Sequence, residues 1–409
     1  MPALPLDWIR TQFPALALSL GGRPVVYLDG PGGTQVPQRV IDAISHYLIT
    51  SNANTHGAFL TSLRSDQVLA EAHAAVADLL GCSAREVVFG ANMTSLTFAL
   101  SRAIGRELGP GDEIVLTGLD HDANFSPWKA LEECGATVRV APFRLGECTL
   151  DVDELLALIN SKTRLVAIGY ASNAVGTINP VRRAIEAAHA VGAWAFVDAV
   201  HYAPHGPIDV RELDCDFLGC SSYKFFGPHQ GLLYGKAELL ERLRPYKVRP
   251  ADEQIPDRWE TGTQNHEAMA GVAAAIDYLA ELGERCGASG SRREKLVGAM
   301  TAVQAAERVL SERLVAGLLA IPGLEFFGIR EPERFGQRTP TVAIRMAGET
   351  PRQTAERLAA EGLFVWDGNY YALNWAERQG LQPGGAVRIG LAHYNTAEEV
   401  DRLLAALAA

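Results

Sequence analysis

The amino-acid sequence predicts an α/β protein with a large domain, built on a mostly parallel, doubly wound sheet, and a smaller C-terminal α/β domain. Three observations lead to this fold class. Short apolar runs alternate with helical segments through residues 113–236, as in folds made of strand–helix–strand units. Several runs end in polar residues, and in such sheets ligands bind beyond the carboxyl ends of the strands. After Glu267 the pattern of predicted elements changes to one long helical stretch followed by short strands.

The first part of the chain is expected to form an arm and the outer elements of the large domain. Residues 1–26 are predicted as an N-terminal arm with a short helix at 7–13. A strand at 25–29 leads into the glycine cluster 30–33, which has neither dinucleotide nor P-loop spacing and is interpreted as a tight turn. The next predicted elements are helices at 37–49, 66–80 and 92–106, a polar loop at 52–57 and a strand at 86–89.

The middle of the chain supplies the predicted parallel sheet. Apolar runs bounded by turn residues indicate strands, and the periodic segments between them indicate helices. The strands are predicted at 113–118, 137–143, 164–171, 193–198, 215–222 and 231–236, and the helices at 124–134, 151–160 and 180–190. Pro180 suits the last helix, because a proline in the first turn loses no helical hydrogen bond.

The C-terminal part is predicted to form the smaller domain. Thr396 and Glu399 have the spacing of a capping box, which indicates the start of a closing helix. The other elements are predicted as helices at 291–319 and 351–361 and strands at 324–328, 340–346, 363–367 and 386–392. The predicted domains are the arm (1–26), the large domain (27–270) and the small domain (271–409).

Composition excludes several classes of function. The 409 residues are 48% hydrophobic and 21% charged, and the formal net charge is −11. Such an acidic chain is not expected to bind nucleic acid or an anionic membrane. No apolar run reaches the roughly 20 residues of a membrane helix, and the N-terminus lacks the pattern of a signal peptide. The six cysteines show no metal-type spacing, so we expect reduced thiols, no metal and a cytoplasmic location.

The strongest chemical signal is the segment that begins at Asp216 and ends at Pro228. Its apolar run leads to two serines, Tyr223 and Lys224, and a Gly-Pro turn follows. Most lysines are solvated surface charges. An amine with largely apolar flanks can instead have a lowered pKa and act as a nucleophile. The hydroxyl of Ser221 can donate to an anion.

A second signal lies upstream, where the apolar run 193–198 ends in Asp198. The run suits a buried parallel strand, and ligands bind beyond the carboxyl ends of such strands. Asp198 alone could equally be a turn or cap residue. A lysine that forms a Schiff base, together with an acid that pairs with a pyridine nitrogen, is what pyridoxal phosphate requires.

With these two motifs the sequence resembles the class V aminotransferase family of fold-type I pyridoxal-phosphate enzymes, and within it the cysteine desulfurases and selenocysteine lyases. The resemblance extends over residues 27–404. The Ser-Ser-Tyr-Lys run ending at Lys224 is similar to the cofactor-lysine motif, and Asp198-Ala-Val-His201 is similar to the pyridine-nitrogen motif. The resemblance implies pyridoxal 5'-phosphate as the cofactor, with Lys224, Asp198 and His121 as catalytic residues.

The resemblance also implies the surroundings of the cofactor. Thr94 at a helix start is an ordinary cap by itself, but helix N-termini also bind phosphate. His121 by itself is more often structural, and the family pattern implies that its ring stacks on the cofactor. Thr263 corresponds to a residue that reaches the phosphate of the neighbouring subunit, which implies a homodimer with shared active sites. The implied cofactor contacts are Met93, Thr94, His121, Asn173, Asp198, His201, Ser221, Tyr223, Lys224 and Thr263.

Two positions depart from the desulfurase pattern. Trp366 takes the place of an arginine, and Tyr371 takes the place of the cysteine that forms a persulfide. A phenol with a pKa of about 10 cannot replace a thiolate. Arg388 matches the arginine that holds a substrate carboxylate, although a structural ion pair is its alternative. The implied substrate contacts are His56, Asn173, Trp366, Tyr371 and Arg388.

These residues predict an enzyme that acts on an α-amino acid through an external aldimine, with lyase-type cleavage at Cβ. Aminotransfer between an amino acid and a keto acid is the first alternative. The alternative from another class is a catalytically idle binding protein derived from a desulfurase. The aromatic residues at 366–375 are interpreted either as a pocket for a larger, more apolar side chain or as core.

Overall fold

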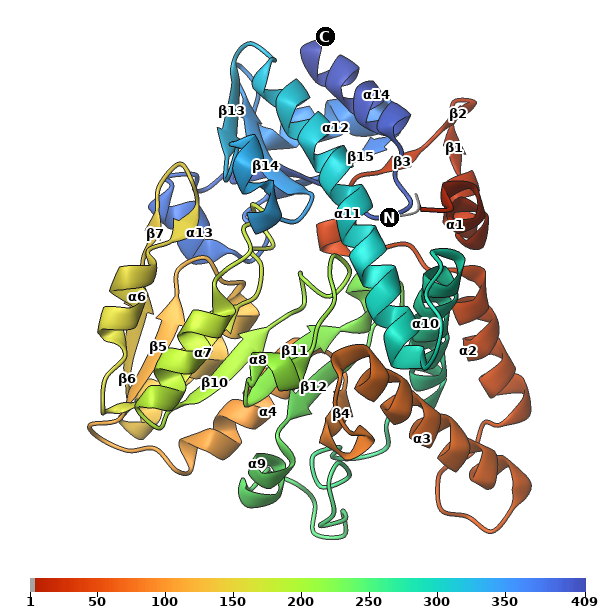
Figure 1. Cartoon of the computed structure of the whole chain (residues 1–409), viewed down its shortest axis with the longest axis vertical. Helices are drawn as coiled ribbons and strands as arrows, with labels where there is room; N and C mark the ends of the chain where they lie inside the picture. Colours follow the sequence, from red (N-terminus) through yellow and green to blue (C-terminus); the bar gives the residue numbers. More distant parts are fainter. Residues whose placement is uncertain (1–3) are drawn as a thin grey trace.

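The computed structural model describes residues 4–409, which fold around a seven-stranded sheet (Figure 1). The strand order is β4-β12-β11-β10-β9-β5-β6, and β12 runs antiparallel to both of its neighbours while the other pairs are parallel. The strands are β4 (Val87–Gly90), β5 (Glu113–Thr117), β6 (Thr137–Ala141), β9 (Thr163–Gly169), β10 (Trp194–Asp198), β11 (Phe217–Ser221) and β12 (Gly231–Gly235). The predicted mostly parallel, doubly wound sheet is confirmed.

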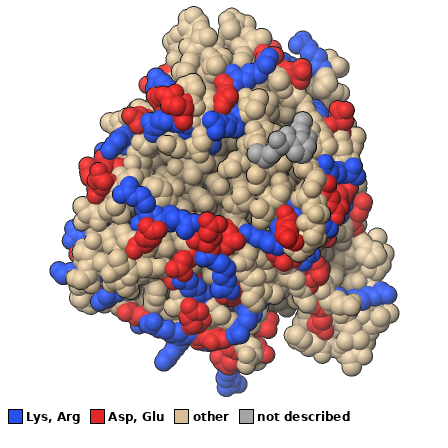
Figure 2. All heavy atoms as spheres, viewed as in Figure 1, with Lys and Arg blue, Asp and Glu red and all other residues tan. Residues whose placement is uncertain are grey.

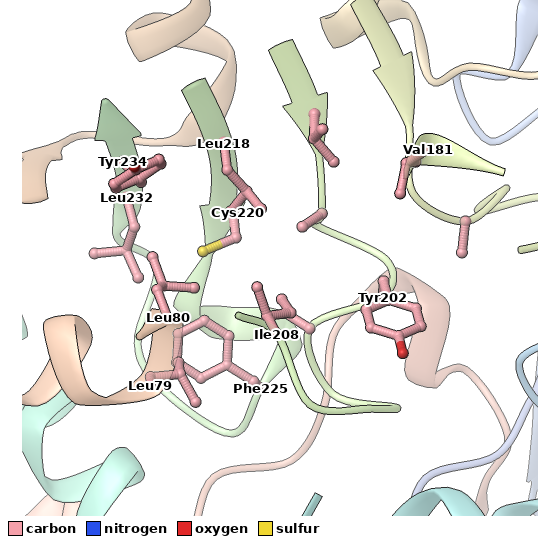
Figure 3. Close-up of a cluster of buried hydrophobic side chains, with 14 of the residues drawn as sticks. Leu79, Leu80, Val181, Tyr202, Ile208, Leu218, Cys220, Phe225, Leu232 and Tyr234 are labelled. Atoms are coloured by element: carbon pink, nitrogen blue, oxygen red, sulfur yellow. The ribbon is translucent and has the colours of Figure 1, made fainter. Parts of the chain in front are cut away.

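Buried side chains cover both faces of this sheet. On one face α4 (Met93–Gly105) contacts β11 and β12. On the other face α7 (Val181–Ala190) contacts β9 and β10, and α3 (Leu60–Leu80) contacts β4. Figure 3 shows Leu79 and Leu80 in the same buried cluster as Leu218, Leu232 and Tyr234 of the sheet. Because both faces are covered, these strands appear in the sequence as continuous apolar runs.

One long helix was not predicted from the sequence. α10 (His266–Arg285) packs against α2 (Gln38–Thr50), α3 and α11 (Arg292–Leu319). Buried residues cover most of α10, and the exposed or half-buried positions Ala270, Ala274, Asp277, Glu281 and Glu284 form one narrow stripe. Because this stripe is narrow and two of its positions are alanines, the contrast between a polar and an apolar face that reveals a surface helix is weak.

A smaller antiparallel sheet forms the C-terminal part, with the order β13-β14-β17-β16. Its strands are β13 (Leu324–Phe327), β14 (Thr341–Met346), β16 (Trp366–Gly368) and β17 (Ala386–Gly390), and α12 (Pro351–Ala360) and α14 (Ala397–Ala408) pack with it. The predicted small α/β unit is confirmed, as is the capping box at Thr396.

The predicted strand 363–367 is wrong in its extent. β15 (Leu363–Phe364) pairs in parallel with β3 (Val26–Tyr27), whereas β16 begins at Trp366 and pairs with β17. A run of apolar residues does not show that the chain changes its pairing partner. The domain limits 1–26, 27–270 and 271–409 remain a prediction.

Other element boundaries also differ. α3 begins at Leu60 rather than at 66, and the predicted helix 124–134 is divided into three short pieces, with Pro127 in the first turn of the central one. Proline cannot donate the hydrogen bond that a continuous helix needs. The other α-helices and strands are α1 (Leu6–Gln12), β1 (Ser19–Leu20), β2 (Arg23–Pro24), α5 (Ser126–Lys129), β7 (Phe143–Arg144), β8 (Thr149–Leu150), α6 (Val152–Leu158), α8 (Val210–Leu213), α9 (Ala237–Arg242) and α13 (Leu373–Arg378). The short 3-10 helices are η1 (Pro14–Ala17), η2 (Gly30–Gly32), η3 (Ala84–Glu86), η4 (Asp122–Asn124), η5 (Ala130–Cys134), η6 (Ser222–Lys224) and η7 (Pro332–Gln337).

The surface carries both signs of charge. Figure 2 shows acidic and basic side chains interspersed over the face in view, without a broad area of one sign. Within residues 4–409, no helix has the length and apolar character needed to cross a membrane.

Candidate active site

Most of the predicted cofactor residues line one pocket, beyond the carboxyl ends of the parallel strands. Asp198, the last residue of β10, pairs with Gly169 of β9 and Gly219 of β11, so the ends of three strands are adjacent. The pocket has a volume of about 590 Å³, part of it open to solvent. It is lined by Asn92, Met93, Thr94, Asp120, His121, Ala123, Gly169, Ala171, Asn173, Asp198, Val200, His201, Ser221, Tyr223 and Lys224.

Lys224 lies at the base of this pocket, directly after β11, and is only 8% exposed. Its Nζ donates a hydrogen bond to the carbonyl oxygen of Pro31 and lies 4.8 Å from the centre of the Tyr223 ring. Burial, with Arg388 nearby, lowers the pKa of Lys224 to about 7, although the Asp198 carboxylate opposes the shift. A large fraction of the amine is therefore neutral near pH 7, as a nucleophile or base requires.

Asp198 is buried, and its Oδ1 accepts a hydrogen bond of 2.9 Å from the backbone N–H of Val200. Burial raises the pKa of Asp198 to about 6, against the opposing charge of Lys224. The carboxylate is thus ionised at neutral pH and can stabilise a proton on a ligand nitrogen.

The sequence interpretation missed Asp120. Its Oδ1 accepts hydrogen bonds from Thr117 Oγ1 (2.7 Å) and the Gly169 N–H (2.9 Å), and its Oδ2 accepts one from Asn124 Nδ2 (3.0 Å). Asp120 therefore ties the end of β5 to β9 and fixes the backbone that carries His121. Its position three residues after β5 and directly before His121, where the family pattern has an acidic residue, was the available signal.

His121 stands at the pocket wall with its Nδ1 accepting the Ala123 N–H at 3.0 Å. This contact leaves the ring proton on Nε2. Burial, with further effects of Lys224 and Arg388, lowers the pKa of His121 to about 3, so the ring is neutral. One face of the imidazole stacks on the Tyr371 ring, with centroids 5.4 Å apart and an interplanar angle of 24°. Stacking of His121 on a cofactor ring remains a prediction.

The start of α4 forms another wall. Asn92 caps the helix by accepting the Ser95 N–H at 2.8 Å, and the Met93 N–H donates to Ser221 Oγ at 3.2 Å. The first-turn amide of Thr94 has no carbonyl one turn earlier to bond, so this end of α4 suits an anion. Gly231, also missed in the sequence, must lack a side chain, because a Cβ would lie 2.2 Å from the Asn92 carbonyl carbon.

Arg388 approaches the pocket from β17 of the small sheet and is 5% exposed. Its Nη1 donates to the backbone oxygen of Asn173 at 3.0 Å, and its guanidinium lies 4.4 Å from the centre of the Tyr370 ring. Within residues 4–409, no carboxylate lies within ion-pair distance of Arg388, and Arg388 Nε and Asn173 Oδ1 are buried without hydrogen-bond partners. The structural ion pair that was the alternative for Arg388 is therefore absent from the described residues.

The aromatic residues near the pocket fall into two groups. Trp375 is fully buried, and the ring of Tyr370 is enclosed between Arg388 and the core. Trp366 and Tyr371 are 52% and 72% exposed. The interpretation as core thus holds for the first pair. The second pair does not line the pocket itself but lies beside it, with Tyr371 stacked on His121 and Trp366 paired with Arg388, and we call this part the mouth of the site.

The segment at Tyr371 has an unusual backbone. Tyr370 and Tyr371 have φ angles of 56° and 59°, in the left-handed region that favours glycine. Two hydrogen bonds to backbone carbonyl oxygens hold the segment. Asn173 Nδ2 donates to the carbonyl oxygen of Tyr370 (2.8 Å), and the Asp122 N–H donates to the carbonyl oxygen of Tyr371 (2.7 Å). Strained residues persist only where the surroundings hold them, and they are common at functional sites.

Two predicted contacts lie elsewhere in this chain. Thr263 and His56 line a separate groove that also includes Asp66, Glu260 and His266. His201 does line the pocket, where its Nε2 lies 3.1 Å from Thr339 Oγ1. Over residues 4–409, no group of three His, Cys, Asp or Glu side chains is arranged to hold a metal ion.

None of the six cysteines, all of which the structure describes, lines the pocket of Lys224. Cys148, Cys215 and Cys220 are buried, and burial raises the pKa of each thiol. These three thiols are therefore poor sources of thiolate.

A parallel-sheet fold that brings a buried lysine and a buried aspartate into one pocket is that of a fold-type I pyridoxal phosphate-dependent enzyme. Residues 26–403 match the family model described as aminotransferase class-V, and the chain belongs to this family. It is a cysteine desulfurase-like member, as the relatives below indicate.

The chain is 32% identical to a cysteine desulfurase of Dickeya dadantii over 98% of this chain and 96% of that protein. It is 34% identical to a cysteine desulfurase of Synechococcus elongatus, of which it spans 62%. Among solved structures, the apo cysteine desulfurase of Thermococcus onnurineus is similar with a TM-score of 0.88 and 26% identity, covering 100% of this chain and 98% of that one. A cysteine desulfurase of Escherichia coli is similar with a TM-score of 0.84 and 28% identity, covering 99% and 98%.

Proposed function

We propose that the chain binds pyridoxal 5'-phosphate at Lys224 and acts on an α-amino acid, cleaving a bond at Cβ without forming a persulfide on the protein. The observation that carries this proposal is that Lys224, Asp198 and His121 line one pocket beside the start of α4. A catalytically idle binding protein would need none of these three groups in that arrangement.

The residues of the pocket fit the cofactor. The start of α4 and the Ser221 hydroxyl offer donors to a phosphate. The buried Asp198 carboxylate suits a protonated pyridine nitrogen, and the neutral His121 ring suits a flat aromatic face. When bound, the cofactor supplies an aldehyde carbon that links to amines and a ring that accepts electrons from the substrate.

The chain's own residues supply the proton chemistry. Lys224, with a pKa lowered to about 7, can accept the proton from the substrate Cα and return one. Asp198 keeps the ring nitrogen protonated. Because the site is buried, water competes little with these charges, and each interaction is stronger than at the surface.

Arg388 is proposed to hold the substrate carboxylate. Its guanidinium has an unpaired Nε, and the neighbouring Asn173 has an unpaired Oδ1. A buried donor without a partner costs free energy, which a carboxylate ligand would relieve. The Asn173 oxygen can accept from the substrate amine.

The absence of persulfide chemistry is proposed from Tyr371 and the cysteines. Tyr371 lies at the pocket mouth, stacked on His121, where the family resemblance expects a cysteine. The buried thiols of this chain lie outside the pocket. A leaving group at Cβ would therefore depart without transfer to a protein sulfur.

We propose a homodimer in which Thr263 and His56 serve the partner's site. These two residues share one groove and do not reach the Lys224 pocket of their own chain. A dimer of Lys224→Ala and Thr263→Ala subunits should recover part of the activity, because one of its two sites is intact. A fully active monomer in sedimentation experiments would remove this proposal.

The proposed reaction is tested by incubating the holoenzyme with each amino acid and analysing the products. Release of the β-substituent with pyruvate and ammonia supports lyase chemistry without sulfur transfer, whereas alanine from cysteine would show that a thiol accepts the sulfur. Formation of a keto acid that requires an amino acceptor would show aminotransfer instead. If no amino acid changes the cofactor spectrum or yields a product, the chain is an idle binding protein.

A further inference from the structure

The turn at Asp29–Gly33 connects the two parts of the site. Its Pro31 oxygen accepts the hydrogen bond of Lys224 Nζ, and Asp29 forms a parallel bridge with Gly390, two residues after Arg388. The glycine cluster that the sequence indicated only as a tight turn thus lies between the lysine of the large sheet and the arginine of the small sheet.

Gly32 leaves room for an indole ring in this turn. A Cβ on Gly32 would lie 2.6 Å from Trp366 Nε1 and 3.5 Å from Arg388 Nη2. The sum of these distances, 6.1 Å, is the largest separation that the two nitrogens can have. A single carboxylate group is wide enough to bridge two donors at such a spacing.

Trp366 and Arg388 also belong to one face of the small sheet. They are directly paired across β16 and β17, and paired residues of antiparallel strands project to the same side. Among the described residues, the Trp366 indole N–H has no hydrogen-bond acceptor, and Arg388 Nε is buried without one. Indole and guanidinium are donors only, so the two side chains together suit an anionic acceptor.

We propose that the Trp366 indole N–H is a second donor to the substrate carboxylate held by Arg388, and that Gly32 is required to leave space for it. This inference rests on the proposed function, in which the substrate is an α-amino acid. It gives Trp366, which the family resemblance implied only as a substrate contact in place of an arginine, a defined donor role.

The test measures the affinity of the holoenzyme for 2-methylalanine, which has no Cα proton to lose, by isothermal titration calorimetry. Trp366→Phe keeps an aromatic ring but removes the N–H. We expect its dissociation constant to rise about tenfold, or about 1.4 kcal/mol. Isopropylamine, which lacks the carboxylate, should bind the wild type and Trp366→Phe equally.

Gly32→Ala provides an independent variant, because the added Cβ displaces the indole ring while residue 366 stays a tryptophan. Gly32 does not have a left-handed φ, so alanine is compatible with the backbone. We expect a similar loss of affinity, and the double variant Gly32→Ala with Trp366→Phe should bind no more weakly than Trp366→Phe alone. Trp194→Phe, at the far end of β10, is the matched control and should leave both affinities unchanged.

The outcomes separate this inference from the proposed function. If the wild type binds 2-methylalanine and Trp366→Phe binds it equally well, the Trp366 assignment is wrong while the amino-acid substrate stands. If Trp366→Phe weakens both ligands to the same extent, the N–H does not contact a carboxylate and the assignment is again wrong. If the wild type binds no amino acid, the proposed function fails and this inference fails with it.

Discussion

The base and the mouth of the site are built in different ways. At the base, Lys224 and Asp198 are 8% and 7% exposed, and they lie at the carboxyl ends of buried strands of the large sheet. At the mouth, Trp366 and Tyr371 are more than half exposed. They belong to a short edge strand and to a left-handed segment held by a few hydrogen bonds.

This difference separates reactivity from selectivity. Burial sets the pKa values of Lys224, Asp198 and His121, so the base has the chemistry common to the family. The side chains of the mouth are exposed and can be exchanged at little cost to folding. Changes at the base should therefore abolish the reaction, and changes at the mouth should alter which reaction occurs.

The largest effect is expected for Lys224→Ala. Without the amine there is no covalent link to the cofactor and no base at Cα, so turnover should fall by at least about a thousandfold. Borohydride reduction followed by peptide mass spectrometry should place the cofactor on Lys224 in the wild type only. Lys162→Ala, on an exposed turn, is the control, and a reduced cofactor attached to any other lysine would contradict the assignment.

A smaller loss is expected for Asp198→Asn. The amide keeps the shape of the side chain but cannot hold the pyridine nitrogen in its protonated state, so turnover should fall about a hundredfold while cofactor still binds. Steady-state kinetics measures the loss of turnover, and the absorbance of the bound cofactor shows whether the variant still binds it. The exposed Asp214→Asn should behave as the wild type, and full activity of Asp198→Asn would exclude an electrostatic role.

The pH dependence of cofactor attachment tests the lowered pKa of Lys224 directly. Because the pKa of Lys224 is lowered to about 7 from the ordinary 10.5, its amine is protonated below pH 7 and neutral above it. The rate at which apoprotein is labelled by added pyridoxal phosphate should rise through pH 7 and level off by about pH 8.

The same pH profile tests whether Arg388 helps to lower the pKa of Lys224. Arg388 is one cause of the lowered pKa of Lys224, so Arg388→Gln should move the midpoint toward higher pH. Stopped-flow absorbance from about pH 5.5 to about pH 9.5 measures the midpoint of the wild type, expected near the pKa of about 7, and the midpoint of Arg388→Gln. A rate that keeps rising beyond pH 9 in the wild type would show that Lys224 has an ordinary pKa.

The smallest effects are expected at the mouth. The wild type should form no persulfide from cysteine, and Tyr371→Cys alone should form little, because a thiol slightly out of place can cost about a hundredfold in rate. Trp366→Arg with Tyr371→Cys should do better than either change alone, since the arginine favours the thiolate. Sulfide release with dithiothreitol is the assay, and brisk persulfide formation by the wild type would mean that another thiol accepts the sulfur.

The sequence predicted the base of the site more completely than the mouth. Lys224 and Asp198 follow apolar runs with clear boundaries, and parallel strands bring their carboxyl ends to one edge of a sheet. Asp120 and Gly231 were missed because their roles, tying β5 to β9 and admitting the start of α4, depend on contacts between distant segments.

By itself, the sequence determined the alternating strands and helices, the capping box of α14, the motifs of the family and the two departures at Trp366 and Tyr371. These are local features, fixed by periodicity and by residue type. Only the tertiary structure decided that α10 is a buried helix, that residues 363–368 divide between two sheets, and that Gly32 lies against Trp366 and Arg388. The physical reason is that burial, pairing partner and close approach depend on residues far apart in the chain, which no local pattern encodes.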